Sequence, residues 1–301
     1  MAPMLPMIGG HRKKSRSLDC LLLALVFAAT GYLGYRVTMQ LHYTWHWGDI
    51  PQYIVRFDKG QQRWVANYLL LGLLTTLRLS LYAAVPALVI GLAMALARIS
   101  RSLFWRLTGR TYIELMRNLP PLVIIFLVYY FLADQLTPLI GADDLLQNLS
   151  PRTAHWLGIL VAPPATVTAF VPAVLTLAVF EGAYIAEILR AGIESVDSGQ
   201  WEAAHALGLS RGQCLRHIIL PQTFRQVLPP LAGQFISLIK DSSIVSVISI
   251  QELTYQGTQL MASTYMTIEV WLLVAAMYFV LTFPCSLLLT RLERSYARGA
   301  T

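Results

Sequence analysis

The chain has 301 residues, of which 56% are hydrophobic and only 13% carry a charge, and its formal net charge is +7. Soluble domains carry about 25% charged residues. This composition therefore excludes an ordinary soluble domain and indicates a membrane protein, because few charges are tolerated among lipid tails. Long apolar runs without period-two alternation favour helices over a β-barrel. The three cysteines are too scattered to predict a disulfide framework or a metal site.

Six stretches are long and apolar enough to cross a bilayer, which takes about 20 residues per helix. In chain order they are Leu18–Met39, Tyr68–Ala97, Ile113–Ala133, Thr168–Leu189, Val227–Ile250 and Thr267–Leu289. The predicted fold class is all-α, a polytopic integral membrane protein with about six transmembrane helices. The fifth stretch is interrupted by Lys240-Asp241, which makes it the least regular of the six.

The placement of lysine and arginine predicts the orientation, because cytoplasmic segments carry the excess of positive charge. If the N-terminus lies inside, most of the 23 basic residues fall in cytoplasmic segments. The outer segments then hold only Arg36, Arg56, Lys59, Arg63 and Arg152. Both termini are therefore predicted to lie in the cytoplasm. A cleaved signal peptide is the alternative for the first stretch, but its apolar run continues through Tyr35, past the small residues near Ala28.

The segment between the fourth and fifth stretches predicts a helix–turn–helix elbow on the cytoplasmic face. Ser198–Leu207 forms the first helix, capped by Asp197 or by the serine that follows it. Gly208 suits the left-handed turn that ends a helix. A second helix is expected over Ser210–Ile219, and Pro221 follows where helices tend to stop. Because the elbow lies between two membrane spans, a nucleic-acid partner is not expected.

The residues of this elbow carry a family resemblance. Glu202-Ala203-Ala204, Gly208, Ile218 and Leu220-Pro221 match the pattern EAA-x3-G-x9-I-x-LP of ABC importer permeases, spacing included. The surrounding AYIAEILRAGIESV, SGQWEAAHALGL and KDSSIVSVIS resemble the polar amino acid permeases of the histidine, glutamine and glutamate type. Met116–Pro121 resembles that family's entry to a span, where R-G-T-P is commoner. The resemblance runs roughly from Gly72 to Arg291.

The resemblance implies a transport subunit of a type I importer rather than an enzyme. In that family the elbow is the coupling helix that docks on a separate ATPase, and the sequence has no Gly-x4-Gly-Lys-Ser/Thr phosphate loop of its own. The implied partners are an ABC ATPase, a periplasmic substrate-binding protein and a second permease subunit, either the same or a related chain, in the bacterial inner membrane. No cofactor is expected.

The resemblance also divides the chain into two parts. Residues 1–65 are expected to hold an N-terminal cytoplasmic segment, an additional transmembrane helix and an outer loop. Residues 66–301 are expected to form the permease domain, of the transmembrane type 1 class. The first span then precedes a five-helix core that is usual for the family.

Ionisable residues within spans are costly in lipid and usually face protein or a water-filled path. The candidate substrate path consists of Glu181, Lys240, Asp241 and Ser242, because acid and base groups complement an amino acid and broken helices often build transporter sites. Two alternatives stay open. Lys240 and Asp241 satisfy one another or fix helix packing, and Glu181 contacts a neighbouring helix. Arg78 is interpreted as structural, with its side chain extending towards the outer interface.

Two other functions remain as alternatives. A secondary transporter driven by an ion gradient would account for the spans and their charges, but it would leave the spacing of the elbow residues unexplained. An ABC permease for another small solute, such as a phosphonate, a metal or an opine, would share the elbow. The flanking segments AYIAEILRAG and KDSSIVSV favour an amino acid.

Overall fold

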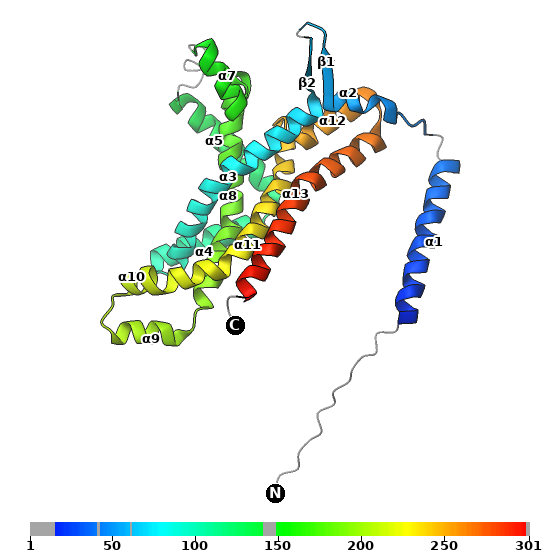
Figure 1. The fold of residues 1–301 in the computed structure, drawn as a ribbon. Coiled ribbons are helices and arrows are strands. Elements are labelled where there is room, and N and C mark those ends of the chain that lie inside the picture. The colour runs from blue at the N-terminus through cyan, green and yellow to red at the C-terminus, as the bar shows by residue number, and fades with distance from the viewer. Residues whose placement is uncertain (1–15, 41–42, 61, 141–148, 299–301) are drawn as a thin grey trace. The chain divides into compact units, whose positions relative to one another are not determined.

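The computed structural model describes residues 16–40, 43–60, 62–140 and 149–298. The chain divides into two compact units, Met1–Trp45 and His46–Thr301. Among its described residues the first unit contains one helix, α1 (Arg16–Gln40), which coincides with the first predicted apolar stretch (Figure 1). All the other elements belong to the second unit, so residues 46–66 pack with the helices that follow them.

The second unit is a bundle of helices with one small hairpin. Its elements are η1 (Trp47–Asp49), α2 (Pro51–Ile54), β1 (Val55–Asp58), β2 (Arg63–Ala66), α3 (Tyr68–Arg98), α4 (Leu103–Asn118), α5 (Pro121–Ile140), α7 (Pro151–Leu160), α8 (Pro164–Glu194), α9 (Ser198–Ala206), α10 (Arg211–Cys214), η2 (Leu215–Ile219), α11 (Leu220–Asp241), η3 (Ser242–Ile248), α12 (Leu253–Thr264) and α13 (Thr267–Arg298).

Four helical segments in the described part of the chain are long and apolar enough to cross a membrane. They are Tyr68–Arg98, Pro151–Glu194, Arg211–Ile248 and Thr267–Arg291. The pair α4 and α5 passes the same test when its two helices are taken together, which gives up to five spans in this unit. The all-α membrane fold is thereby confirmed.

The core of the unit is the pair α3 and α8, which pack along one another. The buried face of α3 consists mainly of small residues at helical spacing, namely Gly72, Thr76, Ser80, Ala83, Ala87, Gly91 and Ala95. A Cβ atom added at Gly91 would lie 2.5 Å from Cγ2 of Ile185, and one added at Gly182 would lie 3.0 Å from Cγ2 of Ile90. Small residues let helix backbones approach closely in membranes, where van der Waals packing drives association.

The prediction of one continuous helix over Ile113–Ala133 is wrong. The structure has two helices, α4 and α5, bent by 120° at Leu119-Pro120. Proline disfavours the helical conformation of the residue before it and has no N–H to donate. Leu119 accordingly has extended backbone angles, φ −91° and ψ 151°. Two successive prolines, Pro120 and Pro121, therefore end one helix and start the next.

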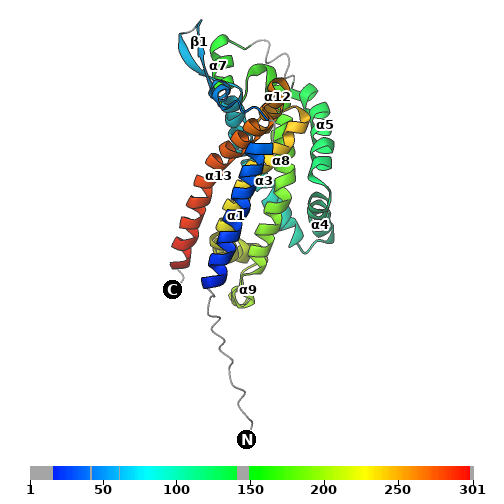
Figure 2. The same ribbon diagram turned by 90° about the vertical axis from the view of Figure 1, so that its right-hand side faces the viewer.

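The end of the unit opposite the elbow carries elements that the sequence did not predict (Figures 1 and 2). Strands β1 and β2 form an antiparallel hairpin in which Val55 pairs with Ala66 and Asp58 with Arg63. Helix α12 lies between the last two spans and is capped by Glu252, whose side chain accepts hydrogen bonds from the N–H groups of Thr254 and Tyr255. At 12 residues α12 is too short to span a bilayer.

Candidate functional site

The predicted elbow forms one end of the second unit (Figures 1 and 2). Helix α9 is capped by Asp197, whose Oδ1 accepts a hydrogen bond of 2.6 Å from the N–H of Gly199. Gly208 has φ +77°, the left-handed conformation that favours glycine. Ser210 then starts α10 with a capping box, in which Ser210 and Gln213 satisfy each other's backbone N–H groups. The predicted caps and turn are confirmed.

The expectation that the second elbow helix stops before Pro221 is wrong. The chain continues from α10 through the π-helical turn η2 directly into α11, with Pro221 in the first turn of α11. Proline is tolerated in a first helical turn, where its missing N–H would lack a partner in any case. The wider π turn before it changes the hydrogen-bond register. The elbow is therefore joined rigidly to the fifth span rather than separated from it by a break.

Short hydrophobic contacts hold the elbow against the ends of α8 and α3. Ile193, Val196, Ala204, Cys214 and Ile219 are buried together, and Leu96 and Ile99 pack against them. An additional link comes from Arg211, whose Nη2 donates to the carbonyl of Ile99 at 2.8 Å. The guanidinium of Arg211 also lies 5.9 Å from the ring centre of Trp201.

The predicted elbow residues divide into a buried set and an exposed set. Ala204 is 1% exposed, and Ile218 and Leu220 are partly buried, so these three residues pack the elbow onto the bundle. The exposed set consists of Glu202, Ala203, Gly208 and Pro221, beside which Leu207 is 79% exposed. The exposed members of the predicted set are therefore one acidic side chain and small residues beside an exposed leucine, which permits close approach by another protein.

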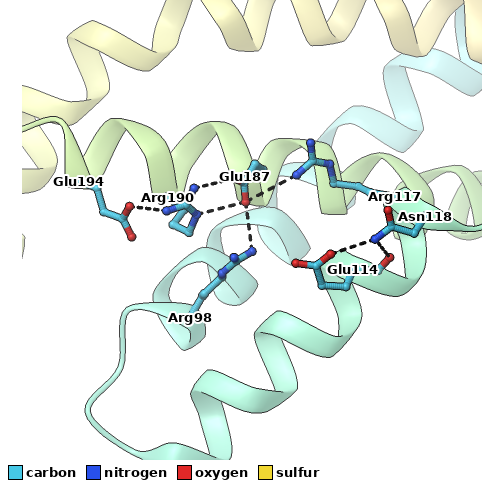
Figure 3. Close-up of polar contacts among 7 residues, drawn as sticks. All are labelled: Arg98, Glu114, Arg117, Asn118, Glu187, Arg190 and Glu194. Atoms are coloured by element: carbon cyan, nitrogen blue, oxygen red, sulfur yellow. Dashed lines mark hydrogen bonds and ion pairs between the residues drawn. The ribbon is translucent and has the colours of Figure 1, made fainter.

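An ion cluster joins three helices beside the elbow (Figure 3). The carboxylate of Glu187 on α8 lies 3.2 Å from Nη1 of Arg98 on α3 and 3.8 Å from Nη1 of Arg117 on α4. Arg190 donates to it through Nη2 at 2.6 Å and Nε at 3.1 Å. Arg190 also pairs with Glu194.

The sequence prediction missed this cluster. Its three arginines entered the sequence analysis only among the basic residues assigned to the cytoplasmic side, and Glu187 was left unassigned. The i, i+3 spacing of Glu187 and Arg190 was a usable indication of a pair on one helix face. The contacts with the other two arginines come from α3 and α4 and depend on tertiary packing.

The polar residues of the candidate substrate path meet only in part. Glu181 is fully buried on α8, and its Oε2 accepts a hydrogen bond of 2.6 Å from Nε2 of Gln234 on α11. Its Oε1 has no hydrogen-bond partner in the described structure. The Asp241 side chain lies beside Glu181. The structure thus brings together two carboxyl groups and an amide between α8 and α11.

Lys240 and Ser242 lie elsewhere. Lys240 is exposed and lines a groove of about 370 Å³ with Trp271 and Tyr278 of α13. The described side chains of Lys240 and Asp241 do not form an ion pair. Ser242 is buried and donates its hydroxyl to the carbonyl of Ile239 at 2.8 Å. The predicted polar break is real, since α11 ends at Asp241 and a 3₁₀ helix follows.

Gln234 was also missed by the sequence prediction. It lies seven residues, about two helical turns, before Asp241, so both face the same side of α11. An amide at this spacing from a predicted path residue was an available indication. Among the described residues no group of three or more His, Cys, Asp or Glu side chains could hold a metal ion.

Comparison with known proteins identifies relatives over most of the chain. The family described as "Binding-protein-dependent transport system inner membrane component" matches residues 87–298. "Probable glutamine ABC transporter permease protein GlnM" of Bacillus subtilis (strain 168) is 36% identical over 231 residues, 75% of this chain and 93% of that protein. "Glutamine transport system permease protein GlnP" of Escherichia coli (strain K12) is 36% identical over 232 residues, 77% and 94% of the two chains.

Two solved structures have similar folds. "Crystal structure of an amino acid ABC transporter with histidines" is 35% identical with a TM-score of 0.60, and the match covers 76% of this chain and 94% of that one. "Inward facing conformations of the MetNI methionine ABC transporter: CY5 native crystal form" is 16% identical with a TM-score of 0.53, over 75% and 96%, and it supports the fold alone. The chain therefore belongs to the family of binding-protein-dependent transport system inner membrane components, and it is a membrane-spanning permease subunit of an ABC importer.

Proposed function

We propose that this permease forms part of the translocation path for a polar amino acid. The observation that carries the proposal is 36% identity to glutamine permeases over three quarters of the chain. A second candidate substrate is an opine, because "Octopine transport system permease protein OccM" of Rhizobium radiobacter is 34% identical over 225 residues. Both substrates carry an amino acid's carboxylate, so the same polar groups along the path would bind either of them.

The elbow is proposed to couple this path to a separate ATPase. Its contact surface would consist of Glu202, Ala203 and Gly208, together with the exposed Leu207. The residues proposed for coupling also include Ala204, Ile218, Leu220 and Pro221, which connect that surface to the bundle. Since η2 and α11 continue from the elbow without a break, displacement of the elbow would move the fifth span with it.

The orientation and the assembly belong to the same proposal. The elbow and both termini are placed in the cytoplasm of a bacterium, with the chain in its inner membrane, which agrees with the distribution of basic residues. The proposed assembly adds a periplasmic binding protein and a second permease, the same chain or a related one. The permease domain is proposed to begin at residue 66, after the additional span of residues 1–65.

Glu181, Lys240, Asp241 and Ser242 remain the proposed substrate path. The pair Glu181 and Asp241 is its strongest part, because two carboxyl groups lie side by side there and no described N–H or O–H group donates to Oε1 of Glu181, so an ammonium group would complement the pair. Lys240 faces a different groove from this pair. It would therefore meet the substrate at another stage of transport, or from the side of the second permease.

Charge reversal at Glu202 tests the coupling. The permease, its partner ATPase and the binding protein are reconstituted in proteoliposomes, and both amino acid uptake and ATP hydrolysis are measured. Glu202→Lys should reduce substrate-stimulated ATP hydrolysis and uptake together, at least tenfold, without loss of the purified permease. Asp49→Lys is the matched control, since Asp49 is an exposed acidic residue outside the elbow. Uptake that persists when ATP hydrolysis is abolished would contradict the proposal and favour an ion-driven transporter.

A further inference from the structure

A cavity lies between helices α3, α7 and α8 and the segment that leads into α12, at the end of the unit opposite the elbow. Its volume is about 350 Å³, within the usual range of small-molecule sites, roughly 300–1,000 Å³. Its lining combines apolar side chains with the polar groups of Thr75, Arg78, Ser249, Gln251 and Gln256. None of the described residues that line it is acidic.

Arg78 is the cation of this cavity. It is ten residues beyond Tyr68, the first residue of α3, which places its Cα about 15 Å along the helix at 1.5 Å per residue. Its side chain is partly buried, and no hydrogen bond or ion pair joins it to another described residue. A cation at such a depth is costly unless it has a partner or faces water. The interpretation of Arg78 as merely structural leaves that cost unexplained.

A second cavity continues the first. It has a volume of about 480 Å³ and shares Leu71, Gln251 and Gln256 with the cavity of Arg78. Its other lining residues include Tyr255 and Gln259, and again none of the described lining residues is acidic. The two cavities therefore make one recess that carries amide and hydroxyl groups and a single positive charge.

The turn beside Arg78 holds a strained residue. Ser249 lines the cavity with φ +63°, a left-handed conformation that is uncommon for residues other than glycine. Such strain persists only where the surrounding structure enforces it, and it clusters at ligand sites. Ser249 also ends η3, the 3₁₀ helix that starts at Ser242 beside the Glu181–Asp241 pair. One short helix thus connects the recess to the proposed substrate path.

We propose that this recess is an outer binding site for the transported amino acid, in which Arg78 binds the α-carboxylate. The proposal rests on the proposed function. The guanidinium supplies paired donors that match a carboxylate, and Gln251 and Gln256 supply amide groups for the remaining polar atoms. The absence of acidic lining residues favours an anionic group at Arg78. The substrate would then move along η3 towards Glu181, where its ammonium group would meet the carboxyl pair.

Direct binding to the permease–ATPase complex tests this assignment. The complex is placed in nanodiscs without the binding protein, and saturation binding is measured for L-glutamine, L-glutamate, L-histidine, L-arginine and octopine. For whichever compound binds the wild type, Arg78→Gln should weaken binding at least tenfold, and Arg78→Lys should retain part of the affinity. The carboxamide derivative of the same compound, which lacks the carboxylate, should bind the wild type as weakly as the acid binds Arg78→Gln.

Two controls separate this inference from its alternatives. Arg152→Gln removes a positive charge from the exposed start of α7, outside the recess, and should leave the affinity unchanged. Uptake in proteoliposomes with the binding protein is measured in parallel. If wild-type uptake of every compound is absent, the proposed function fails. If the wild type transports an amino acid and Arg78→Gln binds and transports it equally well, the site at Arg78 is refuted. Anionic lipid that co-purifies with the wild type and is lost from Arg78→Gln, with amino acid binding unchanged, would refute it as well.

Discussion

Glu187 lies where α3, α4 and α8 converge, and its carboxylate faces three guanidinium groups (Figure 3). The side chain of Glu187 is 25% exposed, so solvent screens these pairs in part. Removing the carboxylate would leave Arg98, Arg117 and Arg190 close together without their shared counter-charge. The cluster therefore contributes to the packing of three helices through a single side chain.

Glu187→Gln is expected to destabilise the permease by roughly 1–2 kcal/mol, between the values for exposed and buried ion pairs. The measurement is the apparent Tm of the purified permease complex in detergent, at low and at high salt. Glu194→Gln is the matched control, because Glu194 is 56% exposed and pairs with Arg190 alone. The control should change the Tm much less. A Tm of Glu187→Gln no lower than that of Glu194→Gln would show that the cluster does not stabilise the bundle.

The local structure of some functional residues could be predicted from the sequence, whereas the contacts of others could not. The caps at Asp197 and Ser210 and the turn at Gly208 were predictable, because they depend on contacts within a few residues. The contacts of Glu181 with Gln234 and of Glu187 with Arg98 were not, because each joins two different helices. Arg190, three residues after Glu187, was the one partner that the sequence indicated, and the contacts with Arg98 and Arg117 depend on the fold.

At the scale of elements, the elbow depends on the backbone conformation of Gly208. A side chain there would meet no heavy atom within 4 Å, so the cost of substitution comes from the positive φ and not from crowding. β-branched residues adopt this conformation least readily, whereas asparagine tolerates it.

Gly208→Val is therefore expected to distort the elbow and to lower substrate-stimulated ATP hydrolysis severalfold, while Gly208→Asn should stay near the wild type. Limited proteolysis of the purified permease provides a second measurement, in which the valine variant should be cleaved faster between α9 and α10. Because the two replacements fill similar open space, equal activity of both variants would mean that the left-handed turn is not required for coupling.

The spans were predicted from apolar runs, and their interruptions were not. Tyr68–Ala97 matches α3 to within one residue, because a long apolar run has few alternatives in lipid. The bend at Leu119-Pro120 was missed because the run of apolar residues continues past it. The π turn of η2 packs against the ends of α8 and α9, and the short helix α12 packs against α3 and α13, which a local sequence pattern does not record.

At the scale of the molecule, the second unit contains all four buried hydrophobic clusters of the described chain. The glutamine permeases match 75–77% of this chain over 93–94% of their own length. The relatives therefore have little counterpart to the remaining quarter. The family model, which starts at residue 87, likewise leaves the N-terminal part of the chain unmatched.

A variant that begins at His46, preceded by a starting methionine, is expected to insert and to assemble with the partner ATPase. The reason is that no buried cluster loses a member when Met1–Trp45 is removed. The measurements are the yield of the purified complex, its apparent Tm and its ATP-dependent uptake. Deletion of α13 residues 267–298 is the control that should fail, because Val270 and Val274 belong to a buried cluster. Failure of the shorter chain to insert would assign a structural role to the first unit.

The fold class and the family could be predicted from composition and the spacing of the elbow residues, since both reflect constraints that act along the chain. The arrangement of helices at the recess of Arg78 could not be predicted. Its walls come from four segments that lie up to about 180 residues apart in the sequence. Arg78 is one arginine in an apolar run in the sequence, and it becomes a candidate ligand-binding group only when the cavity around it is known.

The close crossing of α3 and α8 at Gly91 and Gly182 has a mechanical consequence. At Gly91 the side chain of Ile185 packs directly against the backbone of α3. At Gly182 the side chain of Ile90 packs against the backbone of α8, so the two helices are in close contact at their crossing. A rotation of α8 driven by the elbow would therefore be passed directly to α3. Arg78, which lies on α3, would move at the same time. A methyl group added at Gly91 would clash with Ile185 and separate the two helices, so the movement of α8 would no longer be passed directly to α3.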